Sequence, residues 1–92
     1  MIRHIVLIRP ISLAQVEIEI DAISTLRGKI QGLKSFTFGR NESGINKGFS
    51  VFISFDFNDQ ESLNLWQINP AHDPIRENLL KSSEMIVLDY TF

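Results

Sequence analysis

The sequence contains no cysteine and no excess of positive charge. Without thiols the chain cannot form disulfides, use a thiolate nucleophile or bind a metal through sulfur, and this composition is typical of an intracellular protein. Nine Lys and Arg residues stand against eleven Asp and Glu residues, and the basic residues are scattered along the chain. Because nucleic-acid binding needs a basic stripe, we do not expect a nucleic-acid partner.

Long hydrophobic runs are also absent. The most apolar stretch, Met1 to Arg9, is too short for a membrane span and does not have the pattern of a signal peptide, and Arg9-Pro10 closes it. We therefore expect a strand at this position. The sequence predicts a cytoplasmic protein with no membrane partner.

The composition that remains is that of one small compact domain over residues 1–92. Hydrophobic residues make up 43% of the 92 residues, and seven of them are Phe. A chain of this length buries only about 60% of its unfolded surface, so its core is thin. Association with a second subunit is one way to hide the remaining apolar surface.

Hydrophobic periodicity predicts four strands and two helical regions. We expect strands at residues 2–9, 33–40, 49–57 and 84–92. We expect a helix of about 17 residues between the capping residue Ser12 and the stop at Gly32, and a second helix, broken in the middle, at residues 61–68 and 74–82. This β-α-β-β-α-β order predicts an α+β, ferredoxin-like fold. Its four-stranded antiparallel sheet has the order 4-1-3-2, with the helices on one face.

The face of this sheet that turns away from the helices is predicted to be apolar. Ile5 and Leu7 point to it from the first strand, and Phe52 points to it from the third. No segment of the chain remains to cover this face. We therefore predict a homodimer through Ile5, Leu7 and Phe52, with two sheets packed face to face.

The break in the second helix is the first candidate site. Asn69-Pro70-Ala71-His72 is followed by Pro74, and the two prolines restrict the backbone on both sides of His72. A rigid elbow positions a side chain well, so His72 is a candidate general base. The alternative is an ordinary turn whose histidine is a surface or capping residue, and the spacing alone leaves both open.

A second candidate site lies on neighbouring strands of the predicted sheet. His4 is near the start of the first strand and Asp89 is near the end of the antiparallel fourth strand, on the same face, so we expect them to meet. A carboxylate beside an imidazole fixes its tautomer and orientation, as in a catalytic or ligand-binding pair. The alternative is a structural hydrogen bond between two buried polar groups.

No metal or cofactor is predicted. His4, His72 and Asp89 are residue types that bind metals, but they show no His-x-x-x-His or similar spacing. Because the chain also has no thiol, redox chemistry would need a cofactor or the substrate itself.

Five short motifs, in order along the chain, give the sequence a specific resemblance to a known family. It resembles the stress-responsive A/B barrel (Dabb) family of small dimeric α+β barrels. That resemblance implies the fold, the homodimer and a pocket between helices and sheet, while most members of the family have no assigned reaction. The motifs are Met1-Ile2-Arg3-His4-Ile5-Val6-Leu7, Gly39-Arg40-Asn41, Gly48-Phe49, Asn69-Pro70-Ala71-His72 and Val87-Leu88-Asp89-Tyr90.

The family includes a plant polyketide cyclase, olivetolic acid cyclase, and the resemblance to this enzyme is distant. It implies catalytic roles for His72, His4 and Asp89. Two positions depart from the cyclase pattern: Trp66 stands where the cyclase has a catalytic Tyr, and Val51 stands where it has a further His. We therefore do not expect the same cyclase activity.

Two classes of function follow from these observations. In the first, the protein binds a small apolar or aromatic carbonyl compound, as a cyclase-, lyase- or cofactor-free monooxygenase-like enzyme would, with His72 as base and His4 and Asp89 polarising the ligand. In the second, it is a non-catalytic, stress-associated dimeric module. A cavity of about 300 Å³ or more that reaches His72 would favour the first class. The predicted ligand-binding residues are Ile20, Ile23, Val51, Ile53, Trp66, Ile75, Met85 and Val87.

Overall fold

The computed structural model describes residues 1–92 and contains four strands and three α-helices. A 3₁₀ turn, Arg27–Lys29, follows the first helix, and none of the helices is long and apolar enough to cross a membrane. The elements in chain order are β1 (Ile2–Pro10), α1 (Leu13–Thr25), β2 (Leu33–Arg40), β3 (Val51–Phe57), α2 (Gln60–Gln67), α3 (Asp73–Ser82) and β4 (Ser83–Thr91).

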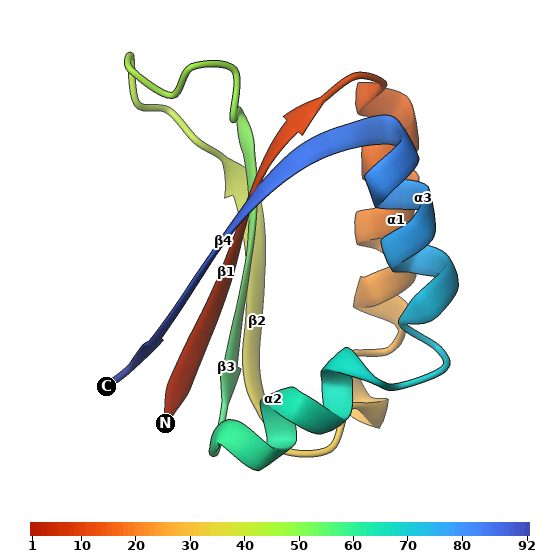
Figure 1. Ribbon diagram of the computed structural model, residues 1–92, viewed down its shortest axis with the longest axis vertical. Coiled ribbons are helices and arrows are strands. Elements are labelled where there is room, and N and C mark those ends of the chain that lie inside the picture. The colour runs from red at the N-terminus through yellow and green to blue at the C-terminus, as the bar shows by residue number, and fades with distance from the viewer.

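The four strands form one antiparallel sheet in the order β2-β3-β1-β4. This is the predicted order 4-1-3-2 counted from the other edge, so the ferredoxin-like α+β fold is confirmed. Helices α1 and α3 lie side by side over one face of the sheet, and α2 closes the end of this layer below them (Figure 1). The two chain ends meet at the same end of the sheet, where the Met1 amino group donates to the Phe92 carbonyl at 3.1 Å.

Helix α1 is shorter than the sequence predicted, with 13 residues instead of about 17. It begins as expected, because the Ser12 hydroxyl accepts a hydrogen bond from the Gln15 amide at 3.3 Å. It ends at Thr25, whose hydroxyl donates back to a backbone carbonyl in the preceding turn. Gly28, a poor helix former, lies in the 3₁₀ turn that follows.

Gly32 has a different role from the predicted helix stop. Its φ of +77° is in the left-handed region, and a Cβ atom here would lie 2.0 Å from the Ser62 hydroxyl. Only glycine combines this backbone conformation with so close an approach. The turn before β2 therefore packs directly against the start of α2, which helps to place α2 at the end of the sheet.

The interior between sheet and helices is filled by a cluster of 15 buried hydrophobic residues. Trp66, Phe55 and Phe57 are the largest side chains in it, and each is at most 2% exposed. The inward face of β1 contributes Val6 and Ile8, as predicted.

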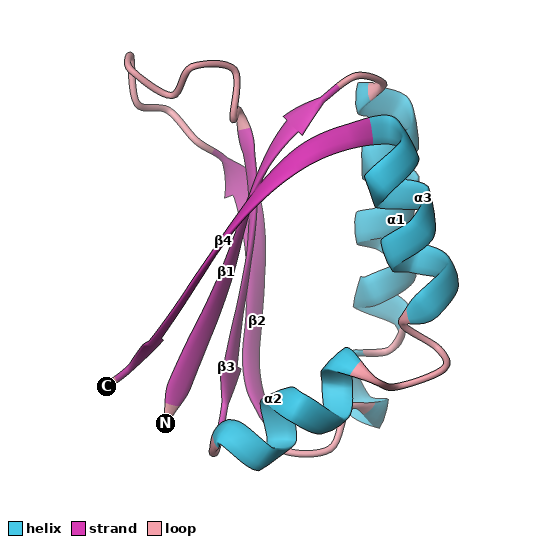
Figure 2. Cartoon of the chain, in the orientation of Figure 1, coloured by secondary structure: helices cyan, strands magenta, loops and turns pink.

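The other face of the sheet has no element over it (Figure 2). On this face Ile5 and Leu7 of β1 are only half-buried in the single chain. Leu7 pairs with Phe52 on one side and with Ile86 on the other, and Ile5 pairs with Leu88. An apolar surface therefore runs across three strands without a cover.

Candidate functional site

His4 and Asp89 meet as the sequence predicted. They are direct partners in the β1–β4 register, and His4 Nδ1 lies 2.5 Å from Asp89 Oδ1. His4 is 6% exposed, whereas the Asp89 side chain is 39% exposed. Because a carboxylate only accepts, the Nδ1 of His4 donates this hydrogen bond, and the pair fixes the orientation of a buried imidazole.

His72 precedes α3 and is held by the backbone of the elbow. Its amide donates to the Asn69 carbonyl at 2.9 Å, and its carbonyl accepts from the Arg76 amide at 2.9 Å. The Asn69 side chain accepts from the Ala71 amide, also at 2.9 Å, which closes an Asx turn. These bonds fix the position of His72 without using its imidazole, which caps nothing.

The imidazole of His72 is half-buried, which corrects the expectation of an exposed elbow residue. Its Nδ1 is buried and has no hydrogen-bond partner. Burial lowers the pKa of His72 to about 4, and the neighbouring Arg76 and His4 act in the same direction while Asp73 opposes them. The side chain is therefore a neutral imidazole at physiological pH.

Trp66 joins His72 to the rest of the interior. The two rings meet edge to face, with centroids 4.3 Å apart and planes at 80°. Trp66 also packs against Phe55 at 5.8 Å, and Phe55 packs against His4 at 5.6 Å, so aromatic rings connect the two histidines. The Trp66 indole nitrogen, like His72 Nδ1, is buried without a partner.

The arrangement places a donor and an acceptor on two touching rings. The indole N–H of Trp66 can only donate, and the neutral imidazole of His72 has one nitrogen that accepts. A hydroxyl group or a water molecule can accept from the indole and donate to the imidazole. A carbonyl oxygen can be held if the imidazole proton is on Nδ1, because both rings then donate to it. Sequence reasoning treated Trp66 as an aromatic wall that had lost the phenol proton, and it missed the indole donor because burial of that atom is a tertiary property.

The eight predicted ligand-binding residues do not surround one cavity. Five of them, Ile20, Ile23, Ile53, Trp66 and Ile75, are at most 6% exposed and belong to the filled core. Met85 is partly buried against the core, and Val87, the register partner of the buried Val6, is 54% exposed. Val51 lies at the start of β3, away from the elbow. Their role as ligand walls stays a prediction.

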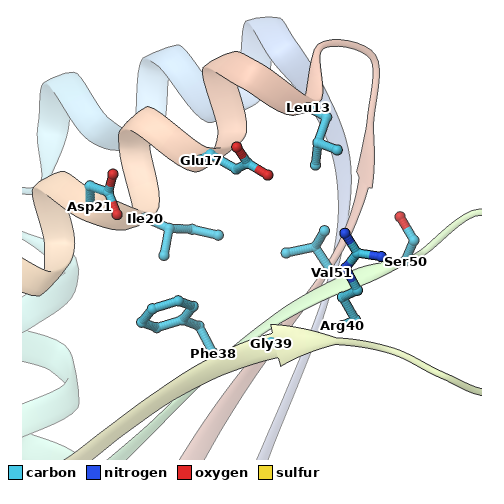
Figure 3. A pocket seen from close by; sticks show the side chains of 9 residues that line it. All are labelled: Leu13, Glu17, Ile20, Asp21, Phe38, Gly39, Arg40, Ser50 and Val51. Atoms are coloured by element: carbon cyan, nitrogen blue, oxygen red, sulfur yellow. The ribbon is translucent and has the colours of Figure 1, made fainter.

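Of the five clefts in the surface, the two main ones are not lined by His72, His4 or Asp89. The larger, about 460 Å³, lies between α1 and the ends of β2 and β3 (Figure 3), and Ile20 and Val51 are the predicted residues that line it. The second, about 390 Å³, lies beside the elbow and is lined in part by Trp66, Asn69 and Pro70. The second cleft thus reaches the neighbours of His72 but not its ring.

The structure contains no group of three or more His, Cys, Asp and Glu residues that could hold a metal ion. His4 and Asp89 form a pair, and His72 approaches this pair only through the aromatic rings between them. The chemistry that these side chains can supply on their own is hydrogen bonding and proton transfer.

Comparison with known proteins adds a family and several structures of the same fold. The model of the stress responsive A/B barrel domain matches residues 2–92. A dimeric ferredoxin-like protein of unknown function from Jannaschia sp. CCS1 is similar with a TM-score of 0.92 and 18% identity, over 99% of this chain and 98% of that chain. No curated protein matches.

Two further solved structures are similar over most of both chains. A dabb family protein with a ferredoxin-like fold from Mesorhizobium loti has a TM-score of 0.80 and 20% identity, covering 99% of this chain and 95% of that chain. A hydroxynitrile lyase from Passiflora edulis has a TM-score of 0.83 and 19% identity, with the same coverage of 99% and 95%. At these identities the similarity is one of fold.

Proposed function

Because the chain belongs to the stress responsive A/B barrel domain family, we propose that it is a homodimer that binds a small apolar or aromatic carbonyl compound at Trp66 and His72. The observation that carries this proposal is the pair of buried nitrogens without partners on these two touching rings. The single chain buries almost all its other side-chain polar atoms with a partner. The exception outside this pair is the hydroxyl of Ser24.

The energy of unpaired polar atoms supports a ligand at this point. A buried donor or acceptor without a partner costs about 1–3 kcal/mol. Together, two such atoms on touching rings would cost a large fraction of the free energy of unfolding of a small domain, which is about 5–15 kcal/mol. A carbonyl oxygen can accept from the Trp66 indole and also from His72 Nδ1, in the neutral tautomer that carries its proton there, so it would satisfy both atoms. The aromatic rings nearby favour an apolar or aromatic body.

The same geometry supports proton transfer. His72 is neutral in the free protein because its pKa is about 4. Negative charge that develops on a bound oxygen would raise this pKa, since an opposite charge nearby favours the imidazolium form. The imidazole therefore takes up a proton only when a ligand supplies that charge. His4, oriented by Asp89, supplies a second fixed imidazole on the inner face of the sheet.

A lyase-like or cyclase-like reaction is the finer form of this proposal. The hydroxynitrile lyase of Passiflora edulis has the same fold, which makes the fold compatible with an enzyme. Trp66 in place of the cyclase tyrosine argues against the cyclase reaction itself, because an indole does not release its proton as a phenol does. The cofactor-free monooxygenase alternative rests on the fold alone.

The non-catalytic module is the second candidate, and one observation favours it. The core is filled, and neither of the two main clefts is lined by His72. On this reading the protein acts through its dimer and its surfaces, and the unpaired nitrogens hold a water molecule.

The homodimer is proposed through the uncovered face of the sheet, with Ile5, Leu7 and Phe52 at its centre. Ile86 and Leu88 extend the same face and are 51% and 53% exposed in the single chain. Proteins similar in fold from Jannaschia sp. and Thermobifida fusca are described as dimeric. A cytoplasmic location remains part of the proposal.

The ligand proposal is tested with the indole N–H signal of Trp66, the one tryptophan of the chain, in a ¹⁵N–¹H NMR spectrum. Acetophenone should move this signal saturably, and ethylbenzene, which has a similar shape but no carbonyl oxygen, should move it little. The reason is that only the ketone can accept from the indole. If neither compound moves the signal, or both move it equally, the non-catalytic module is the better account.

A further inference from the structure

The cleft of about 460 Å³ between α1 and the ends of β2 and β3 is distant from the proposed site. Val51 of this cleft pairs with Ile8, whereas Phe55 pairs with His4. Four positions along a strand correspond to roughly 13 Å. The cleft also lies toward the β2 edge of the sheet, while Asp89 is on the opposite edge strand β4. It shares none of Trp66, His72, His4 and Asp89.

Apolar side chains form the body of the cleft. Ile20 from α1 and Val51 from β3 lie inside it, and Leu13 and Phe38 line it while remaining 47% exposed each (Figure 3). Exposed large apolar side chains around one hollow are typical of a binding surface. The volume is within the range of about 300–1,000 Å³ for small-molecule sites.

Three charged side chains also line the cleft, and none of them has a partner in the chain. Glu17 and Asp21 are four residues apart on α1 and repel each other, and Arg40 lies at the end of β2. None of the three makes an ion pair or a side-chain hydrogen bond. The other four arginines are engaged: Arg3, Arg9 and Arg76 form ion pairs, and Arg27 stacks over Phe36.

The positions of these charges divide the cleft into two ends. Arg40 and the Ser50 hydroxyl lie together at one end, Asp21 lies toward the other end, and Glu17 points into the space from α1 (Figure 3). A guanidinium with a hydroxyl beside it suits a carboxylate, which arginine binds in a bidentate manner. The two helix carboxylates suit an ammonium group.

We infer that this cleft is a second binding site, for a small amphipathic zwitterion with an apolar body, one carboxylate and one ammonium group. A simple anion would bind Arg40 but face two carboxylates, and a simple cation would bind Glu17 and Asp21 but face the guanidinium. A molecule with both charges gives each of the three side chains a partner. Its apolar body covers Ile20, Phe38 and Val51.

The test uses three related probes on the intact protein: L-phenylalanine, phenethylamine and 3-phenylpropanoate. The first has both charges, and each of the others has one of them on a similar body. Backbone amide signals of residues 17–21, 38–40 and 50–51 should shift saturably in an NMR titration. Phenylalanine should bind at least about tenfold more tightly than either probe with one charge, because its carboxylate pairs with Arg40 while its ammonium group faces the helix carboxylates, Glu17 first.

Substitutions in the cleft show which side chain causes each difference in affinity between the probes. In Arg40→Gln, the affinity for phenylalanine should fall to that for phenethylamine. In the double variant Glu17→Gln/Asp21→Asn, it should fall to that for 3-phenylpropanoate. Arg27→Gln removes an arginine outside the cleft and should bind phenylalanine like the wild type. His72→Ala should also bind like the wild type, because this site does not depend on the proposed function.

Three results would overturn the inference. The first is no saturable shift in the cleft with any of the three probes, and the second is equal affinity for all of them. The third is a closed ion pair between Arg40 and Glu17 in solution. A double-mutant cycle of Arg40→Gln and Glu17→Gln would detect that pair as non-additive melting temperatures in the absence of probe.

Discussion

The two faces of the sheet are built from the same strands, yet the chain covers only one of them. On the inner face Ile53 and Phe55 are 1% and 2% exposed, under helices α1 and α3. On the outer face Ile86 and Leu88 are more than half exposed although they are just as apolar. Alternation of apolar residues thus identifies an apolar face, but what covers that face depends on how much chain is left to fold over it.

The polar side chains show the opposite contrast, because those on the outer face are paired with each other while several buried ones on the helix side have no partner. On the outer face Arg3 donates to both carboxylate oxygens of Asp56, at 2.7 and 3.0 Å, and to the Tyr90 hydroxyl at 2.8 Å. Asp56 also accepts from the Ser35 hydroxyl, and these bonds hold its pKa below the usual range, with Arg3 as the main cause. The buried side-chain atoms without a partner are all on the helix side. This contrast supports the proposed protein partner on the outer face and the proposed ligand on the inner one.

Among the variants proposed here, those that disrupt the proposed dimer contact on the outer face should change the protein most. Phe52→Asp places a charge in the proposed contact and should dissociate the dimer to chains of 10.5 kDa or unfold it. Leu88→Asp tests the same contact at a residue that is 53% exposed in the single chain, so its monomer should stay folded. Light scattering at micromolar concentration measures the mass.

Ile18→Asp is the matched control, because Ile18 is 57% exposed on helix α1 and outside the proposed contact. It should leave the mass unchanged. A wild-type protein that is already a monomer, or a Leu88→Asp variant that stays a dimer, would contradict the assignment of this face.

On the inner face, breaking the His4–Asp89 pair should have the next largest effect. Asp89→Ala leaves the buried Nδ1 of His4 without an acceptor and should lower the free energy of unfolding by about 1–3 kcal/mol. Asp89→Asn keeps an acceptor and should cost less. Glu84→Ala breaks the exposed ion pair of Glu84 with Arg9 on the same strand and should cost at most about 1 kcal/mol.

Urea unfolding at pH 7 gives these values. If Asp89→Ala and Glu84→Ala lower the free energy of unfolding equally, burial of His4 does not strengthen its pair with Asp89. The proposed difference between buried and exposed polar pairs would then be wrong.

The unpaired imidazole of His72 should make the free energy of unfolding depend on pH. The pKa of His72 is about 4 when folded, below the unfolded value near 6.5, so the unfolded state binds this proton more readily. Stability should therefore be full above pH 6.5 and fall as the pH drops toward 4. Because the ring is only half-buried, we expect a loss on the order of 1–2 kcal/mol. His72→Gln should have a flatter profile over the same range, and an identical profile would contradict this cause.

The smallest effect is expected for His72→Ala at pH 7. The imidazole caps no helix and its Nδ1 has no partner, so its loss should lower the free energy of unfolding by less than about 1 kcal/mol. Thermal melts compare this variant with Asp89→Ala. A loss for His72→Ala that equals or exceeds the loss for Asp89→Ala would indicate a structural histidine at the elbow.

The sequence predicted those parts of the fold that depend on periodicity and strand order. The contact between His4 and Asp89 followed from two antiparallel neighbours with a period of two, because register then places both side chains on one face. The end of α1 was harder to place, since Gly28 and the Thr25 hydroxyl stop the helix before the apolar pattern does.

Burial at the elbow and the shape of the large cleft could not be predicted in the same way. His72 is half-buried because Trp66 of α2 packs against it, and the local sequence pattern does not predict that contact. The charges around the cleft come from α1 and β2, and they lie together only because α1 crosses the end of the sheet at this edge. Both are properties of packing between elements far apart in the chain.

The central claim is that His72 is a neutral, unpaired imidazole inside the protein. An NMR titration of the two histidines, with the His72 signal assigned by its loss in His72→Gln, tests this claim most directly. We predict that the ring of His72 stays neutral until the pH approaches 4, because burial disfavours its charged form. A midpoint near 6.5 would instead show a solvated side chain, and the proposed ligand site would lose its buried, unpaired imidazole.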